Sequence, residues 1–243
     1  MSELLSFQAQ LVQIPSTLTY MLGVYPPDFI PGPINEVVEL FGAVDRIVVV
    51  LIDNFGLFET TMYKPQFLIE YSNALVLLAT RNPYTLGVLQ QVMYGGFERE
   101  VNGYHFLRYL NQNERTTLYI GRQRDIERYD GNTPSVAKNS DMATWIEAAK
   151  VINRTNLTLV HFLDFEDIHR KQARMGRSPE ALIEKLIRRT DKWILSMYKQ
   201  LRSNSLMIIL GDHGRYKMDF SYSGKIAEWR QASVPVAIFV KKE

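Results

Sequence analysis

Acidic side chains stand at the ends of three apolar runs of the chain, and two of them have a histidine close behind. These residues are Asp53, Asp164 with His169, and Asp212 with His213. Carboxylate oxygens and imidazole nitrogens are ligands that suit zinc, manganese and similar divalent ions. Carboxylates gathered without a cation would repel one another and raise each other's pKa. The pattern therefore predicts a metal site.

The composition limits what kind of metal site this is. The 243 residues include no cysteine, so disulfides, iron–sulfur clusters and thiolate zinc sites are excluded. The chain has four histidines, which are His105, His161, His169 and His213. A metal site must therefore consist mostly of carboxylate and hydroxyl oxygens, with a few imidazoles.

Thr85 is the candidate nucleophile, because it precedes a helix that the sequence predicts over 86–93. A hydroxyl group at that position lies beside the free N–H groups and the positive end of the helix dipole, which favour a phosphate or another oxyanion. Threonine is also an ordinary N-cap residue that contributes about 1 kcal/mol without any chemistry. Both roles stay open for Thr85.

The other candidates have structural alternatives as well. Asp53 could belong to a turn after a strand, since aspartate favours turns. Asp164 could cap the helix that follows it, and His169 could lie on the surface. The strongest signal is the pair Asp212 and His213, because it places two ligands directly after an apolar strand.

Strands and helices alternate along the chain. The expected strands are 46–53, 73–80, 116–121, 157–163, 206–210 and 234–240, and the expected helices are 86–93, 104–110, 141–152 and 179–201, of which the last is long. This alternation predicts an α/β fold with a mainly parallel sheet, whose ligands bind at the carboxyl ends of the strands. We expect a single domain over 1–243, in which 1–45 form a Pro-rich lead-in arm with short helices.

Charge and hydropathy favour a small-molecule partner. Lys and Arg number 28 against 26 Asp and Glu, a net charge of +2, and they are scattered rather than concentrated on one face as in nucleic-acid-binding proteins. No run approaches the roughly 20 apolar residues of a membrane span, and the first residues lack the features of a signal peptide. We expect a cytoplasmic protein that binds neither nucleic acid nor membrane, and the oligomeric state stays open.

The order of these residues resembles that of the alkaline phosphatase superfamily over residues 48–239. The likeness is closest to the type I phosphodiesterase/nucleotide pyrophosphatase branch, with the Asp-to-His spacing of the phosphopentomutase form. The positions that match are Asp53 at the first strand end, Thr85 as nucleophile, Asp164 with His169, Asp191 in the long helix, and Asp212-His213-Gly214 as the Asp-His-Gly motif. The resemblance implies a three-layer α/β/α core with a mainly parallel central sheet, and the chain has no room for a large cap domain.

The resemblance also implies a metal-dependent hydrolase of phosphate mono- or diesters, including nucleotides. The implied ligands are Asp53, Thr85, Asp212 and His213 for one ion, and Asp164 and His169 for a second. Zinc or manganese, at one or two ions per chain, is the expected cofactor. The Thr85 hydroxyl, with its pKa lowered by the first ion, would attack phosphorus in line.

One family motif lacks its match. The family has a further histidine in a His-Gly pair, where this chain has Ser223-Gly224, and no histidine follows His213. A catalytic zinc normally has three protein ligands, so the second site would be one short unless Asp219 or His105 substitutes. The alternative is a degenerate, catalytically weak or inactive member that binds a metal or ligand. A sulfatase or phosphonate hydrolase relative also fits, and a Rossmann-like domain fits less well because no Gly-rich loop follows the first strand.

Overall fold

A single mixed β-sheet forms the centre of the molecule, as a computed structural model shows for residues 8–81, 84–97, 101, 103–213 and 233–242. The sheet has eight strands in the order β1-β3-β8-β7-β2-β6-β4-β5. Their bounds are β1 Gln8–Gln10, β2 Arg46–Ile52, β3 Ala74–Ala79, β4 Thr117–Gly121, β5 Ser135–Ala137, β6 Leu157–Phe162, β7 Ser205–Gly211 and β8 Ser233–Lys241. Only β8 runs antiparallel to its neighbours, β3 and β7, so the mainly parallel sheet expected from the sequence is confirmed.

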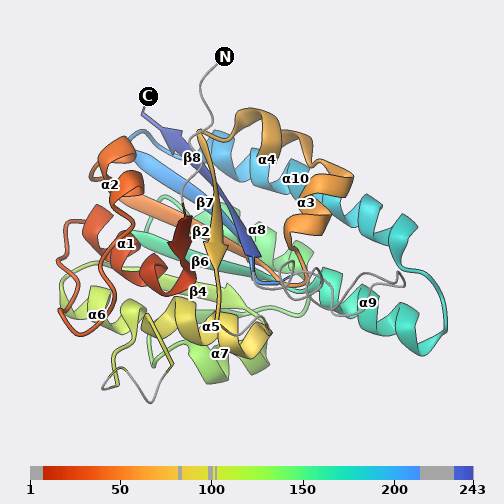
Figure 1. The fold of residues 1–243 in the computed structure, drawn as a ribbon, viewed down its shortest axis with the longest axis horizontal. Coiled ribbons are helices and arrows are strands. Elements are labelled where there is room, and N and C mark those ends of the chain that lie inside the picture. Colours follow the sequence, from red (N-terminus) through yellow and green to blue (C-terminus); the bar gives the residue numbers. More distant parts are fainter. Residues whose placement is uncertain (1–7, 82–83, 98–100, 102, 214–232, 243) are drawn as a thin grey trace.

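Helices cover both faces of the sheet, which gives the three-layer α/β/α arrangement (Figure 1). One face carries α1 Ile14–Met21, α2 Asn35–Phe41, α5 Thr85–Tyr94, α6 Phe106–Gln112 and α7 Gln123–Tyr129. The other carries α3 Leu57–Tyr63, α4 Gln66–Tyr71, α8 Asp141–Val151, α9 Asp164–Arg174 and α10 Glu180–Gln200. No large cap domain is present among the described residues.

The central strands are apolar along their whole length because both of their faces are covered. In β2 the side chains of Val49 and Leu51 belong to the first core, and those of Val48 and Val50 to the second. This alternation assigns a face to the residues beyond the strand as well, since side chains of a strand alternate in direction. Asp53 continues the series of Val49 and Leu51 toward the face that α5 covers.

The first 45 residues pack into the body of the protein. Leu11, Leu18 and Met21 are fully buried in the core on the α5 side of the sheet, and the short strand β1 pairs with β3. The stretch expected as a lead-in arm is therefore part of the hydrophobic core over its described residues. Within those residues, no helix combines the length and apolar character needed to cross a membrane.

Gly211, the last residue of β7, allows a close approach of two backbones. It lies opposite Ile52 of β2, and a Cβ atom at this position would lie 1.9 Å from the carbonyl oxygen of Phe55. Any larger residue must therefore displace the turn that follows β2.

We expect Gly211→Ala to lower the free energy of unfolding by about 1–3 kcal/mol or more, the usual cost of overpacking. Urea unfolding measures this loss. Gly32→Ala is the matched control, because nothing lies within 4 Å of a Cβ atom there. Equal stability of the Gly211 variant and the wild type would contradict the close approach.

Candidate metal centre

Two aspartates lie side by side because their strands are neighbours. In the parallel pair β2 and β7, Ile52 is in register with Gly211, so the next residues, Asp53 and Asp212, leave the sheet together. The Asp53 N–H donates to the Phe162 carbonyl at 3.0 Å, and the Asp212 N–H donates to the Ile52 carbonyl at 3.2 Å. Both side chains are completely buried.

The turn after β2 holds the Asp212 carboxylate in place. Asn54 has a positive φ of 56°, a conformation that Asn tolerates better than most residues. Its N–H donates to Asp212 Oδ1 at 2.8 Å, and the N–H of His213 donates to the same oxygen. The position of the Oδ1 atom is thereby fixed by two backbone N–H groups.

His213 and Thr85 complete the group. His213 Nε2 lies 3.0 Å from Asp212 Oδ2 and 3.6 Å from Asp53 Oδ1. Thr85 Oγ1 lies 2.8 Å from His213 Nε2 and 3.4 Å from Asp53 Oδ1. The four side chains that the family resemblance implied for one ion therefore lie close together.

Thr85 is the first residue of α5, a helix of 10 residues. The residue before it, Tyr84, has extended backbone angles and is the N-cap, and its side chain makes no capping hydrogen bond. Thr85 is thus not the N-cap that the structural alternative required. Its hydroxyl instead faces the buried acids at the positive end of the helix.

The electrostatics of this group are unfavourable without a cation. Burial, followed by the charge of Asp212, raises the pKa of Asp53 well above its usual range. Asp53 Oδ2 is buried and accepts no hydrogen bond from the described residues, and Asp212 Oδ2 has only the contact with His213 Nε2 among them. Leaving a buried carboxylate oxygen without a donor or a cation costs free energy.

The donor set fits a divalent metal ion. One ligand atom from each of Asp53, Asp212 and His213 can be chosen so that all lie within 4.8 Å of one another, and all three residues are buried. Two carboxylates and one imidazole are ligands that zinc and manganese accept. Among the described residues, Asp53, Asp212 and His213 are therefore the candidate ligands of a metal ion.

Asp164 and His169 lie elsewhere, on helix α9, and do not belong to that group. Asp164 is the first residue of α9, and its two carboxylate oxygens are bound by Arg122 and Arg189. The second ion that the resemblance implied at Asp164 and His169 stays a prediction. The Ser223-Gly224 pair and Asp219, which bear on its missing ligand, fall outside the described residues.

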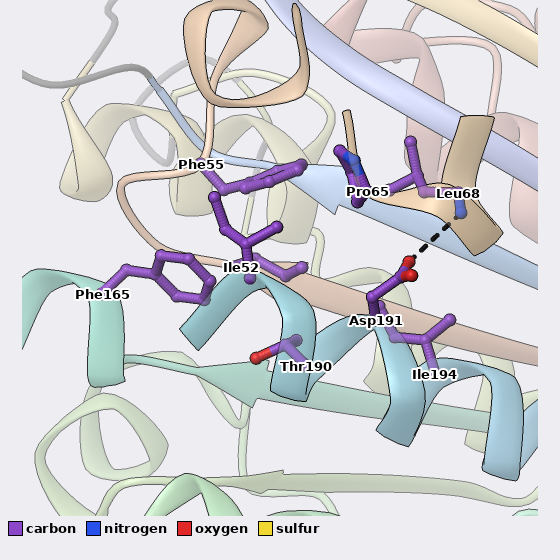
Figure 2. Close-up of a pocket in the computed structure, with 9 residues that line it drawn as sticks. Ile52, Phe55, Pro65, Leu68, Phe165, Thr190, Asp191 and Ile194 are labelled. Carbon is purple, nitrogen blue, oxygen red and sulfur yellow. Dashed lines mark hydrogen bonds between the residues drawn. The ribbon is translucent and has the colours of Figure 1, made fainter. Parts of the chain in front are cut away.

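Asp191 has a structural role in the described residues. Its carboxylate accepts the N–H groups of Phe67 at 3.0 Å and of Leu68 at 3.2 Å, at the start of α4. Figure 2 shows this carboxylate directed from α10 at the backbone of α4, beside a small apolar pocket that Ile52 and Phe165 help to line. Asp191 therefore links the two helices.

The two remaining histidines are buried. His105 Nε2 lies 2.9 Å from the Tyr129 carbonyl, to which it donates, and its ring packs edge-on against Tyr94. His161 lies 3.2 Å through Nδ1 from the Tyr119 hydroxyl. Both rings therefore lie in the core, and neither is among the described residues that gather at Asp53.

Charged residues after β4 were not singled out in the sequence. Arg122 contacts Asp164, and Arg124 Nη2 lies 2.8 Å from Glu166 Oε2. Their proximity to α9 depends on the pairing of β4 with β6, which no local pattern reveals. The signal that could have found them is their position directly after a strand.

Comparison with known structures identifies the fold. A protein in the alkaline phosphatase superfamily from Vibrio parahaemolyticus matches with a TM-score of 0.58 at 11% identity, over 95% of this chain and 67% of that one. The fold is that of the alkaline phosphatase superfamily. The resemblance seen in the sequence is confirmed at this level.

Further solved structures have a similar fold. The C-terminal periplasmic domain of EcEptC from Escherichia coli, in a complex with zinc, matches with a TM-score of 0.57 at 14% identity over 82% of this chain and 74% of that one. Murine ectonucleotide pyrophosphatase/phosphodiesterase 5 matches with a TM-score of 0.53 at 13% identity, over 82% and 81%. No protein-family model and no curated protein sequence matches the chain. The expected cytoplasmic location is not tested by these structures and stays a prediction.

The buried His105 gives a pH dependence that is separate from the metal centre. Burial lowers its pKa from 6.5 to about 4, since a second proton would have to sit on Nδ1, which is buried without a partner. Between these pH values the unfolded chain binds a proton that the folded protein does not. This contribution to stability is therefore complete above pH 6.5 and is lost as the pH falls toward 4.

We expect His105→Gln, which keeps an N–H donor for the Tyr129 carbonyl, to flatten the pH dependence of the free energy of unfolding in this interval. The slope that His105 contributes is at most about 1.4 kcal/mol per pH unit. Urea unfolding at several pH values measures it. An unchanged slope in the variant would contradict the assignment of the proton uptake to His105.

Proposed function

We propose that this protein is a metal-dependent phosphoric ester hydrolase in which Thr85 is the nucleophile. The observation that carries the proposal is the position of Thr85 Oγ1, 2.8 Å from His213 Nε2 and 3.4 Å from Asp53 Oδ1. A hydroxyl group is a poor nucleophile unless a base or a metal activates it. Here it lies against the donor set that fits a metal ion, at the N-terminus of α5.

Asp53, Asp212 and His213 would hold the ion, and the Thr85 hydroxyl could complete the set. A bound zinc or manganese ion would supply a Lewis acid that lowers the pKa of that hydroxyl. The backbone N–H groups in the first turn of α5 have no helical carbonyl partner and can donate to the non-bridging oxygens of a phosphate ester. The N-terminus of the helix therefore orients the phosphorus toward Thr85.

The reaction takes place in two displacements. Thr85 Oγ1 loses its proton and forms a bond to phosphorus, while the bond from phosphorus to the alcohol oxygen breaks and the alcohol leaves with a proton. Water then attacks the phosphothreonine, which releases the phosphate product and restores the hydroxyl group.

A small phosphate ester or a nucleotide is the proposed substrate. The known structures with this fold include an ectonucleotide pyrophosphatase/phosphodiesterase and a phosphoethanolamine transferase A from Neisseria meningitidis, the latter with a TM-score of 0.51 at 12% identity. The names of both proteins describe reactions at phosphate esters. The similarity of fold to these two proteins supports a phosphate ester as the substrate.

We expect Thr85→Ala to reduce the hydrolysis of chromogenic phosphate mono- and diesters by about a hundredfold or more, with zinc or manganese present. Thr85→Ser, which keeps the hydroxyl group, is the matched control and should retain a measurable rate. In the wild type, a rapid quench should trap a phosphate group on Thr85 that mass spectrometry detects.

Wild-type rates in Thr85→Ala would contradict the assignment of the nucleophile. Zinc binding by the wild type without turnover of any ester would contradict the hydrolase and would favour the alternative, a degenerate member that binds a metal or ligand. Circular dichroism of each variant establishes that the fold is intact.

A further inference from the structure

Asp164, the residue that matches a ligand of the second metal ion in the family, is already neutralised by protein cations. Its Oδ1 atom lies 3.1 Å from Arg122 Nη2, and its Oδ2 atom lies 2.8 Å from Arg189 Nη2. Each carboxylate oxygen therefore has a guanidinium partner. A metal ion could bind Asp164 only if at least one of these ion pairs broke.

The two arginines are themselves held in place. The Arg189 guanidinium lies 4.1 Å from the centroid of the Trp193 ring, and that ring is stacked on Trp145 at 5.1 Å. Arg122 donates through Nη1 to the Asn139 carbonyl. Stacking on aromatic rings and hydrogen bonds of this kind fix a guanidinium in one orientation. The arginines are therefore part of the packed structure rather than mobile surface groups.

Asp141 joins Arg122 to the start of α9. Its carboxylate oxygens accept the N–H groups of Leu163 at 3.0 Å and Asp164 at 2.8 Å, and its Oδ1 atom also lies 3.4 Å from Arg122 Nη2. Burial is the main cause that raises the pKa of Asp141 to about 6. Asp141 thus fixes the backbone of Asp164, whose carboxylate the two arginines hold.

The helix also separates Asp164 from His169. Both residues belong to α9, and residues five apart on an α-helix project about 140° from one another around the axis, with a rise of about 7.5 Å. Their side chains therefore leave different faces of α9. A shared ion would require the first turn of the helix to unwind.

The balance of charge contrasts with that at the metal centre. Near α9, the carboxylates of Asp141, Asp164 and Asp167 share the guanidinium groups of Arg122 and Arg189. No Lys or Arg among the described residues makes an ion pair with Asp53 or Asp212. Within the described part of the chain, protein cations therefore pair with the carboxylate at the end of β6, and none pairs with those at the ends of β2 and β7.

We propose that each chain binds one catalytic cation, at Asp53, Asp212 and His213, and that Arg122 and Arg189 close the Asp164 position to a second. This inference rests on the metal centre of the proposed function. It departs from the two-ion arrangement that the sequence resemblance implied. Asp164 then acts as a structural anchor for α9 rather than as a ligand.

The number of zinc ions per chain tests the inference. We would dialyse the full chain to equilibrium against zinc with a weak competing chelator, and then measure zinc and protein by mass spectrometry and absorbance. We expect one ion per chain for the wild type, for Asp164→Asn and for His169→Gln. Asp212→Asn, an isosteric change, should bind none.

Two ions per chain in the wild type would overturn the inference, whether or not Asp164→Asn or His169→Gln reduced the number to one. No ion in the wild type would instead contradict the metal centre, so failure of the inference and failure of the proposed function are distinguished. If Asp164→Asn does not fold, as judged by circular dichroism, the wild type and His169→Gln still decide the question.

Discussion

The buried negative charge of Asp53 and Asp212 is the constraint that governs this structure. Two carboxylates lie together at the ends of neighbouring parallel strands, and both are fully buried. Burial and the charge of Asp212 disfavour the charged form of Asp53, as its raised pKa reflects. Proteins normally compensate such a pair with a cation or with hydrogen-bond donors. Among the described residues, the side chains of His213 and Thr85 contact this pair, and both can also contact a metal ion.

The fold creates this constraint through the topology of its sheet. The pairing of β2 with β7 brings together residues that are 159 positions apart, 53 and 212, and Gly211 lets the turn after β2 pass close to the end of β7. Helix α5 packs on the same face and presents Thr85 at its N-terminus. The carboxyl ends of parallel strands are where α/β proteins place their ligands. The metal centre therefore lies where the architecture favours one.

Much of this arrangement could be predicted from the sequence because the signals are local. The apolar runs that end in Asp53 and Asp212 identify central strands, and the parallel alignment of such strands brings their ends together. The helix that directly follows Thr85 made this residue a candidate, and the resemblance to the superfamily favoured its role as nucleophile over that of an N-cap. The structure brings these residues and His213 into one group.

The surroundings of Asp164 could not be predicted in the same way. Arg122 and Arg189 are distant from it in the sequence, and only the pairing of β4 with β6 and the packing of α10 on α9 bring them close. The antiparallel direction of β8 and the burial of Leu11 and Leu18 likewise depend on tertiary contacts. The spacing of apolar residues along the chain predicts which face of a helix or strand is buried. It does not predict which charged residues of other elements will contact it.

The stability of metal-free Asp53→Asn tests the central claim most directly, because most substitutions at buried sites are destabilising. In chelator-treated protein near neutral pH, we expect this variant to unfold at the same or a higher temperature than the wild type, since the amide removes the repulsion with Asp212. Zinc at about 100 times its dissociation constant should stabilise the wild type by about 2.7 kcal/mol. It should have little effect on Asp53→Asn, whereas the exposed control Asp28→Asn should respond like the wild type. A metal-free variant that is clearly less stable than the wild type, or one that zinc stabilises equally, would contradict the claim.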